Sequence, residues 1–306
     1  MSHSITERHP PRPLIFGEVL FDTFPDGSAV LGGAPFNVAW HLQGFGVRPL
    51  LVSRVGQDEH GQKVLKSMQA WNMDTAAMQV DHDHPTGGVV VGFDAGEPSF
   101  DIVAEQAYDY INTERALQAL GDERFALLYC GTLIARHEVS AATLEQIQRR
   151  AGLPRFVDVN LRSPWWNLPL VQRTLSGSRW VKLNDTELFA IAGGGDLAET
   201  AQHLRAEYNL EMLIVTSGAE GAHFCTAEGL AHTPAAPMAE MVDTVGAGDA
   251  FSAVVILGLL HQWPPELTRQ RALAFASAVC GIRGATTNDK NFYLKHLDQW
   301  QEIHSA

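Results

Sequence analysis

Residues 243–260 read DTVGAGDAFSAVVILGLL, and this stretch decides both the fold and the place to look for a site. Gly246, Ala247 and Gly248 carry almost no side chain, and the apolar run after them indicates a buried helix. The first N–H groups of a helix lack partners within it and carry a partial positive charge, and glycines let an anion approach them. The turn is therefore predicted to receive an anion. Asp249 complicates this prediction, because it places a carboxylate in the same turn.

A purely structural explanation is that Asp249 complements the dipole of the first helical turn, an effect of about 0.3–1 kcal/mol. That accounts for an acid but not for the glycines, since Asp243 or Thr244 could already cap a surface helix. Two unit charges ~4 Å apart repel by about 4 kcal/mol at an effective dielectric near 20. A stored phosphate would therefore be unfavourable beside Asp249. The turn better suits a phosphoryl group that arrives transiently while a neighbouring hydroxyl loses its proton.

Upstream of this stretch, apolar β-rich runs alternate with helical patterns. The runs predict strands buried on both faces, at 14–21, 49–55, 125–130, 155–160, 180–183 and 212–217. The segment 196–208 has helical spacing, with one apolar stripe of Leu197, Ala201, Leu204 and Tyr208. This alternation predicts an α/β fold with a mostly parallel sheet between two layers of helices.

One region breaks the alternation. Residues 86–93 and 99–105 predict an antiparallel pair joined by a turn. A sheet this small cannot form its own core, so we expect a lid over a cleft, a homodimer contact through its open edges, or both. We expect a flexible leader at 1–13 and a single domain at 14–306, with the lid built in part from about 86–105.

The composition limits the partners of the chain. Its 306 residues are 45% hydrophobic and carry a net charge of −13, as expected of a soluble globular protein that binds neither nucleic acid nor a membrane surface. No apolar stretch reaches the roughly 18 residues of a membrane span, and the leader lacks the apolar core of a signal peptide. Cys130, Cys225 and Cys280 form no CxxC pair, so we expect buried free thiols in the cytoplasm.

Polar residues follow several predicted strands and should converge, because the carboxyl ends of parallel strands meet at one edge of a sheet. Asp22, Arg162, Asn184 and Gly218 are of this kind. A second stretch, LGGAPFNVAWHLQGFG at 31–46, combines a Gly-Gly pair with a proline suited to the first turn of a helix. Its Asn37 would have an amide free to bond a polyhydroxy substrate, although a plain turn and helix start would explain the same residues.

Three other motifs keep ordinary alternatives. Asn184 and Glu187 could hold water on Mg²⁺ or form a helix cap with a solvated acid. TSGAEG at 216–221 could cradle a phosphate or simply turn a hairpin. His82-Asp83-His84 could bind a metal, but more simply forms a solvated turn. A P-loop is excluded at 56–62, because Gln62 stands where the motif needs Lys.

Together these motifs closely resemble the ribokinase-like (PfkB-type) family of carbohydrate kinases. The stretch 31–46 resembles the N-terminal signature of that family, and DTVGAGDAF at 243–251 resembles its more specific C-terminal signature. The resemblance covers about 14 to 287. It implies a three-layer α/β sandwich with a small β lid, and a transferase that uses ATP and Mg²⁺ to phosphorylate a sugar hydroxyl.

The resemblance also implies residue roles. Asp249 resembles the catalytic base, and the anion hole is Gly246, Ala247 and Gly248. The positions that match sugar contacts are Asp22, Gly32, Gly33 and Asn37. Arg162 could serve the sugar or the ATP phosphates, and Phe100 and Tyr108 could contact the sugar or form the apolar underside of the lid. The positions that match the ATP site are Lys182, Asn184, Thr216, Gly218, Gly221, Gly246, Gly248 and Gly284. The metal positions are Asn184 and Glu187 for Mg²⁺, through water, and Asp243 and Thr244 for the monovalent cation, such as K⁺, of some members.

Within the family, GEVLFDTFP, PTGGVVV, FDIVAEQAYDYI and DVNLRSPWW most resemble fructokinases. The rival, 2-keto-3-deoxygluconate kinase, must hold a carboxylate, which requires a cation or several donors. The lid segment 99–110 contains no Lys or Arg. A neutral hexose, D-fructose first, is therefore expected, and ribose, tagatose and ribosides stay open. A non-catalytic sugar or nucleotide sensor on the same fold is the alternative of another class.

Overall fold

The computed structural model describes residues 11–94, 97–236 and 241–302, whose strands form two sheets. The larger sheet has the strand order β13-β12-β11-β10-β9-β8-β1-β4-β5. Its strands are β1 (Arg12–Phe16), β4 (Leu50–Gly56), β5 (Met78–Asp81), β8 (Phe125–Gly131), β9 (Arg155–Asp158), β10 (Trp180–Asn184), β11 (Met212–Thr216), β12 (Ala222–Thr226) and β13 (Gly229–Thr233). All neighbours from β5 to β11 are parallel, and β12 and β13 are antiparallel additions at one edge.

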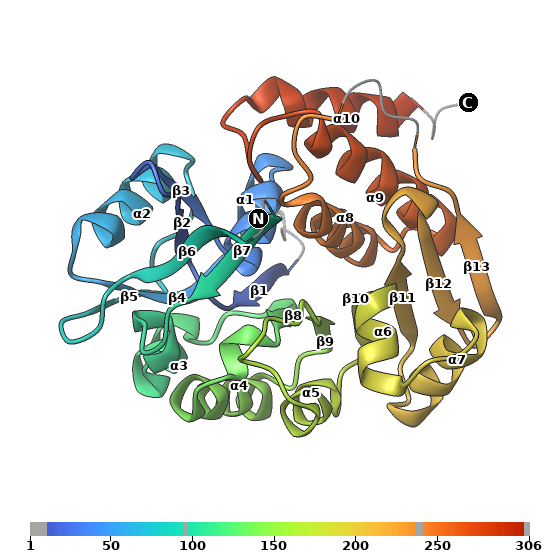
Figure 1. Cartoon of the computed structure of the whole chain (residues 1–306), viewed down its shortest axis with the longest axis horizontal. Helices are drawn as coiled ribbons and strands as arrows, with labels where there is room; N and C mark the ends of the chain where they lie inside the picture. Colours follow the sequence, from blue (N-terminus) through green and yellow to red (C-terminus); the bar gives the residue numbers. More distant parts are fainter. Residues whose placement is uncertain (1–10, 95–96, 237–240, 303–306) are drawn as a thin grey trace, which may run out of the picture.

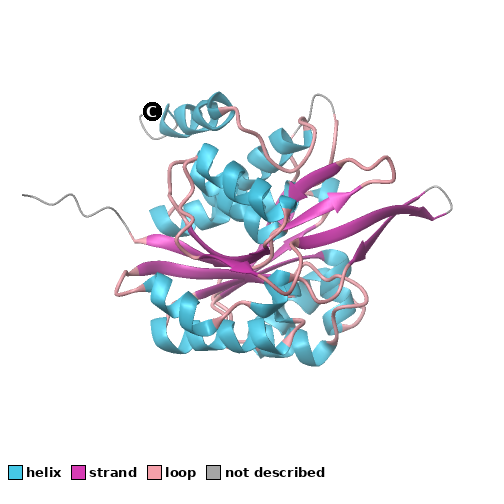
Figure 2. Cartoon of the chain, turned by 90° about the vertical axis from the view of Figure 1, so that its left-hand side faces the viewer, coloured by secondary structure: helices cyan, strands magenta, loops and turns pink. Residues whose placement is uncertain are grey.

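Two layers of helices cover the faces of this sheet, as Figure 2 shows. One layer consists of α1 (Ala34–Gly44), α2 (Glu59–Ala70), α8 (Ala247–His261), α9 (Pro265–Cys280) and α10 (Lys290–Glu302). The other consists of α3 (Thr113–Leu120), α4 (Glu138–Ala151), α5 (Leu168–Leu175), α6 (Asp185–Ala192) and α7 (Leu197–Glu207). Neighbouring strand residues alternate between the two cores, since Ile15 packs into the first and Leu14 and Phe16 into the second. The predicted three-layer architecture is therefore present.

Helix α8 lies deep in the first helical layer (Figure 1). Residues 250–258 are all buried, which is why this stretch is apolar around its whole circumference. Gly258 brings α9 close, because a Cβ there would lie 2.5 Å from the Thr268 hydroxyl oxygen. Packing on every side thus fixes the position of the helix that begins at the glycine-rich turn.

The smaller sheet is the predicted lid, in the strand order β3-β2-β6-β7. Its strands are β2 (Leu20–Thr23), β3 (Ala29–Gly32), β6 (Gly87–Asp94) and β7 (Glu97–Ile102). The predicted antiparallel pair is confirmed by β6 and β7, with Val91 opposite Phe100. Strands β2 and β3 were not predicted. The outermost strands of the smaller sheet are β3, which pairs only with β2, and β7, which pairs only with β6, among the described strands. A homodimer through these open edges stays a prediction.

The prediction of one strand over 14–21 was wrong. Strand β1 ends at Phe16, and the chain then crosses to the lid, where β2 begins at Leu20. Gly17 permits the crossing, because a Cβ there would lie 2.2 Å from Pro35 Cγ. Residues on both sides of the crossing are buried, so the apolar pattern continues through it. The leader is also shorter than predicted, since β1 begins at Arg12; residues 1–10 lie outside the described part.

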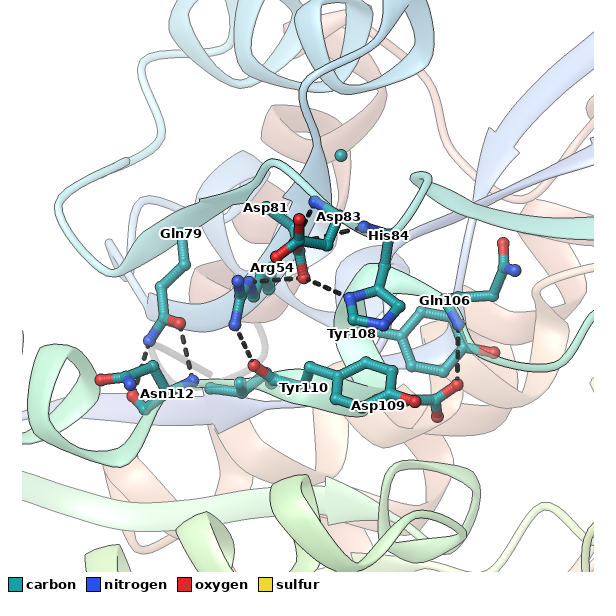
Figure 3. A network of polar contacts seen from close by, with 12 residues as sticks. Arg54, Gln79, Asp81, Asp83, His84, Gln106, Tyr108, Asp109, Tyr110 and Asn112 are labelled. Atoms are coloured by element: carbon teal, nitrogen blue, oxygen red, sulfur yellow. Dashed lines mark hydrogen bonds and ion pairs between the residues drawn. The ribbon is translucent and has the colours of Figure 1, made fainter.

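A polar network anchors the segment that leaves the lid (Figure 3). Arg54 on β4 pairs with Asp81 at 3.0 Å and donates to the Tyr110 carbonyl oxygen. His84 Nδ1 lies 3.0 Å from the same carboxylate, and its ring stacks on Tyr110 with centroids 3.7 Å apart. The turn at 82–84 is therefore solvated at His82 and Asp83, which are exposed as predicted, and only His84 packs against its neighbours. Among the described residues, no cluster of three or more His, Cys, Asp or Glu side chains could hold a metal ion.

Arg136 binds the segment that leaves the lid, at Val103 and Asp109. It follows the short helix η2 (Leu133–Ala135), pairs with Asp109 at 2.6 Å and donates to the Val103 carbonyl oxygen at 2.7 Å. Its guanidinium lies over the rings of Tyr108 and Trp165, at 4.9 and 4.4 Å from their centroids. The base of the lid is thus fixed to the layers around the larger sheet.

Within the described ranges, no helix has the length and apolar character to cross a membrane.

Candidate active site

The glycine-rich turn opens α8 with unpaired N–H groups. Gly246 is the N-cap, in the left-handed region with φ 80°. The Ala247 N–H donates to the Thr244 carbonyl oxygen at 3.3 Å, whereas no described residue accepts from the N–H of Gly248 or Asp249. These two groups, at the positive end of the helix dipole, are available to an anion.

Asp243 fixes this turn to the segment that follows α9. Its two carboxylate oxygens accept backbone N–H groups, from Val245 at 3.0 Å and from Gly284 at 3.1 Å. Gly246 packs so closely on the same segment that a Cβ there would lie 2.4 Å from Ala285 Cβ. Thr244 is exposed. A monovalent cation at Asp243 and Thr244 stays a prediction.

The two family signatures meet at Asp249. Asn37, on the first helix after the Gly-Gly pair, donates from Nδ2 to Asp249 Oδ2 at 2.8 Å. Asn37 is only 5% exposed, and its Oδ1 has no partner among the described residues. One N–H of its amide therefore orients the acid, and the second N–H and the oxygen are left for a substrate.

Lys182, on β10, lies next to the same turn. Its Nζ donates to Asp158 at 3.0 and 2.8 Å, and a Cβ at Gly248 would lie 3.2 Å from it. The Asp158 carboxylate also accepts from Ser252 Oγ at 2.7 Å and Tyr129 OH at 3.3 Å. Our sequence reasoning missed Asp158 and Ser252. The available signal was a carboxylate at the end of a strand predicted to be buried on both faces.

The acid-base character of Asp249 follows from this environment. Burial raises the pKa of its carboxyl to about 6, against the hydrogen bond from Asn37, which lowers it. The charge of Asp158 raises the same pKa, and those of Lys182 and Arg162 lower it. A carboxylate that titrates this close to neutral pH is suited to general base catalysis.

Glu18, in the crossing between β1 and β2, is a second acid that the sequence reasoning missed. It is 2% exposed, and its Oε2 has no hydrogen-bond partner among the described residues. Burial raises its pKa to about 7, and the charge of Asp249 contributes in the same direction, while Arg136 and Arg162 lower it. An acid in the apolar run at 14–21 was its only sequence signal.

The Glu18→Gln variant should become more stable than the native protein as the pH rises, because the native protein loses stability. The folded state binds the Glu18 proton more tightly than the unfolded chain, with a pKa of about 7 against 4.5. The native protein therefore loses stability as the pH rises from 4.5 through 7, by up to about 3 kcal/mol. Chemical denaturation at pH 4.5 and pH 8 should show the variant as stable as the native protein at the lower pH and more stable at the higher. An equal difference at both pH values would contradict this, and the exposed Glu199→Gln serves as control.

The predicted sugar-side residues lie around Asp249 and the base of the lid. A Cβ at Gly32 would lie 3.5 Å from Asp22 Oδ2, and Gly33, with φ 107°, lies so close to Glu18 that a Cβ would meet its carbonyl oxygen at 2.7 Å. Burial raises the pKa of Asp22, and the charge of Arg162 lowers it. Asp22, Gly32, Gly33 and Glu18 therefore lie in one region.

The two aromatic residues predicted for the lid differ in exposure. Phe100, on β7, is 53% exposed. It shares a sheet face with the buried Ile102, two residues further along the strand. Tyr108, on the short helix η1 (Ala107–Tyr110), is fully buried beside Arg136. Tyr108 is therefore part of the core beneath the lid, which is the alternative that the sequence left open.

On the predicted nucleotide side, Asn184 and Glu187 form a capping box. The Asn184 side chain accepts from the Glu187 N–H, and Glu187 Oε2 accepts from the Asn184 N–H, both at 2.8 Å. Glu187 Oε1 accepts from the Leu161 N–H at 2.7 Å. The cap is confirmed, but the acid is not simply solvated, because burial raises the pKa of Glu187.

The loop after β11 also has the predicted form. Strands β11 and β12 are an antiparallel hairpin, with Thr216 at its last pair. Gly218 begins the short helix η3 (Gly218–Glu220), and Gly221 follows it with φ 101°. Gly284, across from Asp243, has φ 81° and open space around it. A role of these residues in binding ATP stays a prediction.

Comparison with known proteins gives a consistent result. The family model for pfkB family carbohydrate kinases matches residues 14–291. The fructokinase of Klebsiella pneumoniae is 30% identical over 300 residues, which are 94% of this chain and 97% of the relative. The aminoimidazole riboside kinase of Salmonella typhimurium is 28% identical over 279 residues, or 88% and 86%.

Solved structures share the fold. The fructokinase of Vibrio cholerae, with fructose, ADP and a calcium ion, has a TM-score of 0.78 at 23% identity and covers 93% of this chain and 98% of its own. A double mutant of that enzyme, with fructose, ADP and a potassium ion, has a TM-score of 0.79 at 22% identity and covers 94% and 99%. The predicted fold is therefore confirmed.

Proposed function

The chain belongs to the pfkB family of carbohydrate kinases, and on that premise we propose that it transfers the γ-phosphate of ATP to a hydroxyl of a neutral sugar, with D-fructose as the first candidate. One observation carries the proposal. Asp249 is held by Asn37 at 2.8 Å, directly beside the unpaired N–H groups of Gly248 and Asp249. The arrangement serves both halves of the transfer, with a base for the hydroxyl proton and donors for the phosphoryl oxygens.

In the proposed reaction, Asp249 accepts the proton of the sugar hydroxyl as the new P–O bond forms. The N–H groups at the start of α8 stabilise the charge on the transferring oxygens. The Lys182 ammonium, next to Gly248, adds a positive charge there. The lid covers the sugar and excludes water, which limits hydrolysis of ATP.

The residues present fit Mg²⁺ only through water. Both carboxylate oxygens of Glu187, and the side-chain oxygen of Asn184, already accept backbone N–H groups. They can still bond water from the hydration shell that Mg²⁺ keeps in proteins. When bound with ATP, Mg²⁺ would neutralise charge on the phosphates. Asn184 and Glu187 would hold it at the end of β10.

The charges around the site favour a neutral sugar. Arg162 is the cation that the sequence left for a substrate carboxylate. Its charge already acts on three carboxyl groups, since it lowers the pKa of Asp22, Glu18 and Asp249. The lid segment from 97 to 110 contributes no Lys or Arg. A sugar acid would add a further negative charge beside these carboxyl groups, and this supports the choice of a neutral hexose.

A coupled assay of ADP release over a sugar panel tests this choice. We expect D-fructose to give the highest kcat/KM, ahead of D-ribose, D-tagatose and aminoimidazole riboside, and 2-keto-3-deoxygluconate the lowest. Preference for 2-keto-3-deoxygluconate would overturn the neutral-sugar argument. ADP release that no sugar stimulates would overturn the proposed transfer.

The pH dependence of kcat/KM should show the titration of Asp249. Only its ionised form can accept the hydroxyl proton, and its pKa is about 6. We expect kcat/KM to be constant above this pH and to fall about tenfold per unit well below it. The Asn37→Ala variant should move this limb to higher pH, because the hydrogen bond from Asn37 lowers the pKa. A profile that is flat from pH 5 to pH 8 would contradict the assignment.

A further inference from the structure

The buried carboxylate of Asp158 joins three separate elements at the edge of the site. It accepts from Lys182 Nζ on β10 at 3.0 and 2.8 Å, from Ser252 Oγ on α8 at 2.7 Å and from Tyr129 OH on β8 at 3.3 Å. Asp158 is 2% exposed and Lys182 is 7% exposed. A buried ion pair gives little net stability compared with apolar side chains of similar volume. The pair therefore points to a role beyond folding.

The pair of Asp158 and Lys182 contacts α8 at two residues, Ser252 and Gly248, which lie on one face of that helix. Ser252 comes four residues after Gly248, and residues four apart lie one above the other on a helix. Lys182 Nζ lies against Gly248, where a Cβ would be 3.2 Å away. Asp158 thus reaches Gly248 through the ammonium and holds Ser252 directly. Both contacts bear on the first turns, where Asp249 and the unpaired N–H groups lie.

From this geometry we propose that Asp158 is a positioning residue of the reaction, which holds the Lys182 ammonium against the anion turn and ties the first turns of α8 to the sheet through Ser252. The inference rests on the proposed phosphoryl transfer. Nothing requires Asp158 to touch the sugar or ATP. Its effect passes through Lys182 and α8.

The position of Asp158 also gives it an electrostatic effect on the base. The charged and titratable groups that act on Asp249 come from several elements: Glu18 before β2, Asp158 on β9, Arg162 after β9 and Lys182 on β10. Asn37 on α1 adds a hydrogen bond. The charge of Asp158 raises the pKa of Asp249, and that of Lys182 lowers it. The two partners of the ion pair therefore act on the base in opposite directions.

A matched pair of variants separates positioning from packing. Ser252→Ala and Tyr129→Phe each remove one hydroxyl donor from Asp158 and leave both buried charges in place, but only Ser252 belongs to α8. With D-fructose, Ser252→Ala should lower kcat by about 10- to 100-fold with little change in KM. Tyr129→Phe should stay within about twofold of the native kcat. Equal kcat values for the two variants would overturn the proposal.

An NMR titration provides a second readout that needs no turnover. In full-length protein labelled at the aspartate carboxyl carbons, the Asp249 signal is assigned by its absence in Asp249→Asn. The Asp249 pKa should fall by about one unit in Asp158→Asn and rise by about one unit in Lys182→Met. Shifts in the same direction, or none, would overturn the proposal. If either variant fails to fold, as removal of one buried partner can cause, the Ser252 and Tyr129 comparison decides.

Failure of the inference differs from failure of the proposed function. If the native protein phosphorylates no sugar, the proposed function is wrong, and the titration still reports whether Asp158 and Lys182 act on Asp249. If the native protein is active and Ser252→Ala matches Tyr129→Phe, only the inference is wrong.

Discussion

Replacing Asp249 by Asn should lower kcat by about 10²- to 10⁴-fold, the range for loss of a general base. Asparagine keeps the shape of the side chain, and its oxygen can still accept from Asn37 Nδ2, which lies 2.8 Å from Asp249 Oδ2. KM for the sugar should therefore change little. Steady-state kinetics at pH 8, where native Asp249 is ionised, give the comparison.

Stability measurements exclude unfolding as the cause of that loss. Burial raises the pKa of Asp249 to about 6 from 3.8, so its ionised form destabilises the folded state above that pH. The variant should be at least as stable as the native protein at pH 8. Asp298→Asn, the same change on the exposed side of α10, should leave kcat unchanged. A nearly native kcat for Asp249→Asn would show that another group takes the proton.

Replacing Gly246 by Ala should disrupt the anion turn. Its φ of 80° is unfavourable for a residue with a Cβ, at about 1–2 kcal/mol. The added atom would lie 2.4 Å from Ala285 Cβ and 2.5 Å from its Cα, and such overpacking costs about 1–3 kcal/mol more. The N–H donors at the start of α8 must move to relieve this contact. We expect kcat to fall about 10²-fold or more, as when one donor to a developing oxyanion is lost.

Gly27 offers a matched control for that variant. It has φ 81°, in the turn between β2 and β3, and an added Cβ would meet nothing within 4 Å. Gly27→Ala should therefore lose only the conformational term, with kcat close to native. Denaturant unfolding and steady-state kinetics compare the two. Equal losses in both variants would show that the contact with Ala285 does not hold the turn.

The layered fold could be predicted from the sequence because its strands are buried on both faces and appear as continuous apolar runs. The crossing from β1 to β2 could not, because residues buried in the large sheet and residues buried at the base of the lid have the same apolar pattern. The turn at Gly17 depends on contact with Pro35, which no local pattern shows. The same limit explains why β2 and β3 were not assigned to the lid.

The residues of the site also divide into those that the sequence could predict and those that it could not. Asp249, Asn37 and Lys182 lie in recognisable motifs and could be named from the sequence. Asp158 and Ser252 could not, since the hydrogen bond that gives them meaning joins positions 94 residues apart. Glu18 was missed because a single acid in an apolar run does not show that its carboxyl is buried near another acid. Motifs thus identified the groups proposed for the chemistry, and the structure identified the groups that orient them and shift their pKa values.

The central claim is that the phosphoryl group passes to a sugar hydroxyl rather than to water. ³¹P NMR of the native protein with ATP, Mg²⁺ and D-fructose tests this most directly. We predict a phosphate monoester signal that grows in step with ADP, without inorganic phosphate, and its absence in Asp249→Asn. ADP that appears only with inorganic phosphate, or a monoester signal that persists unchanged in Asp249→Asn, would contradict the account.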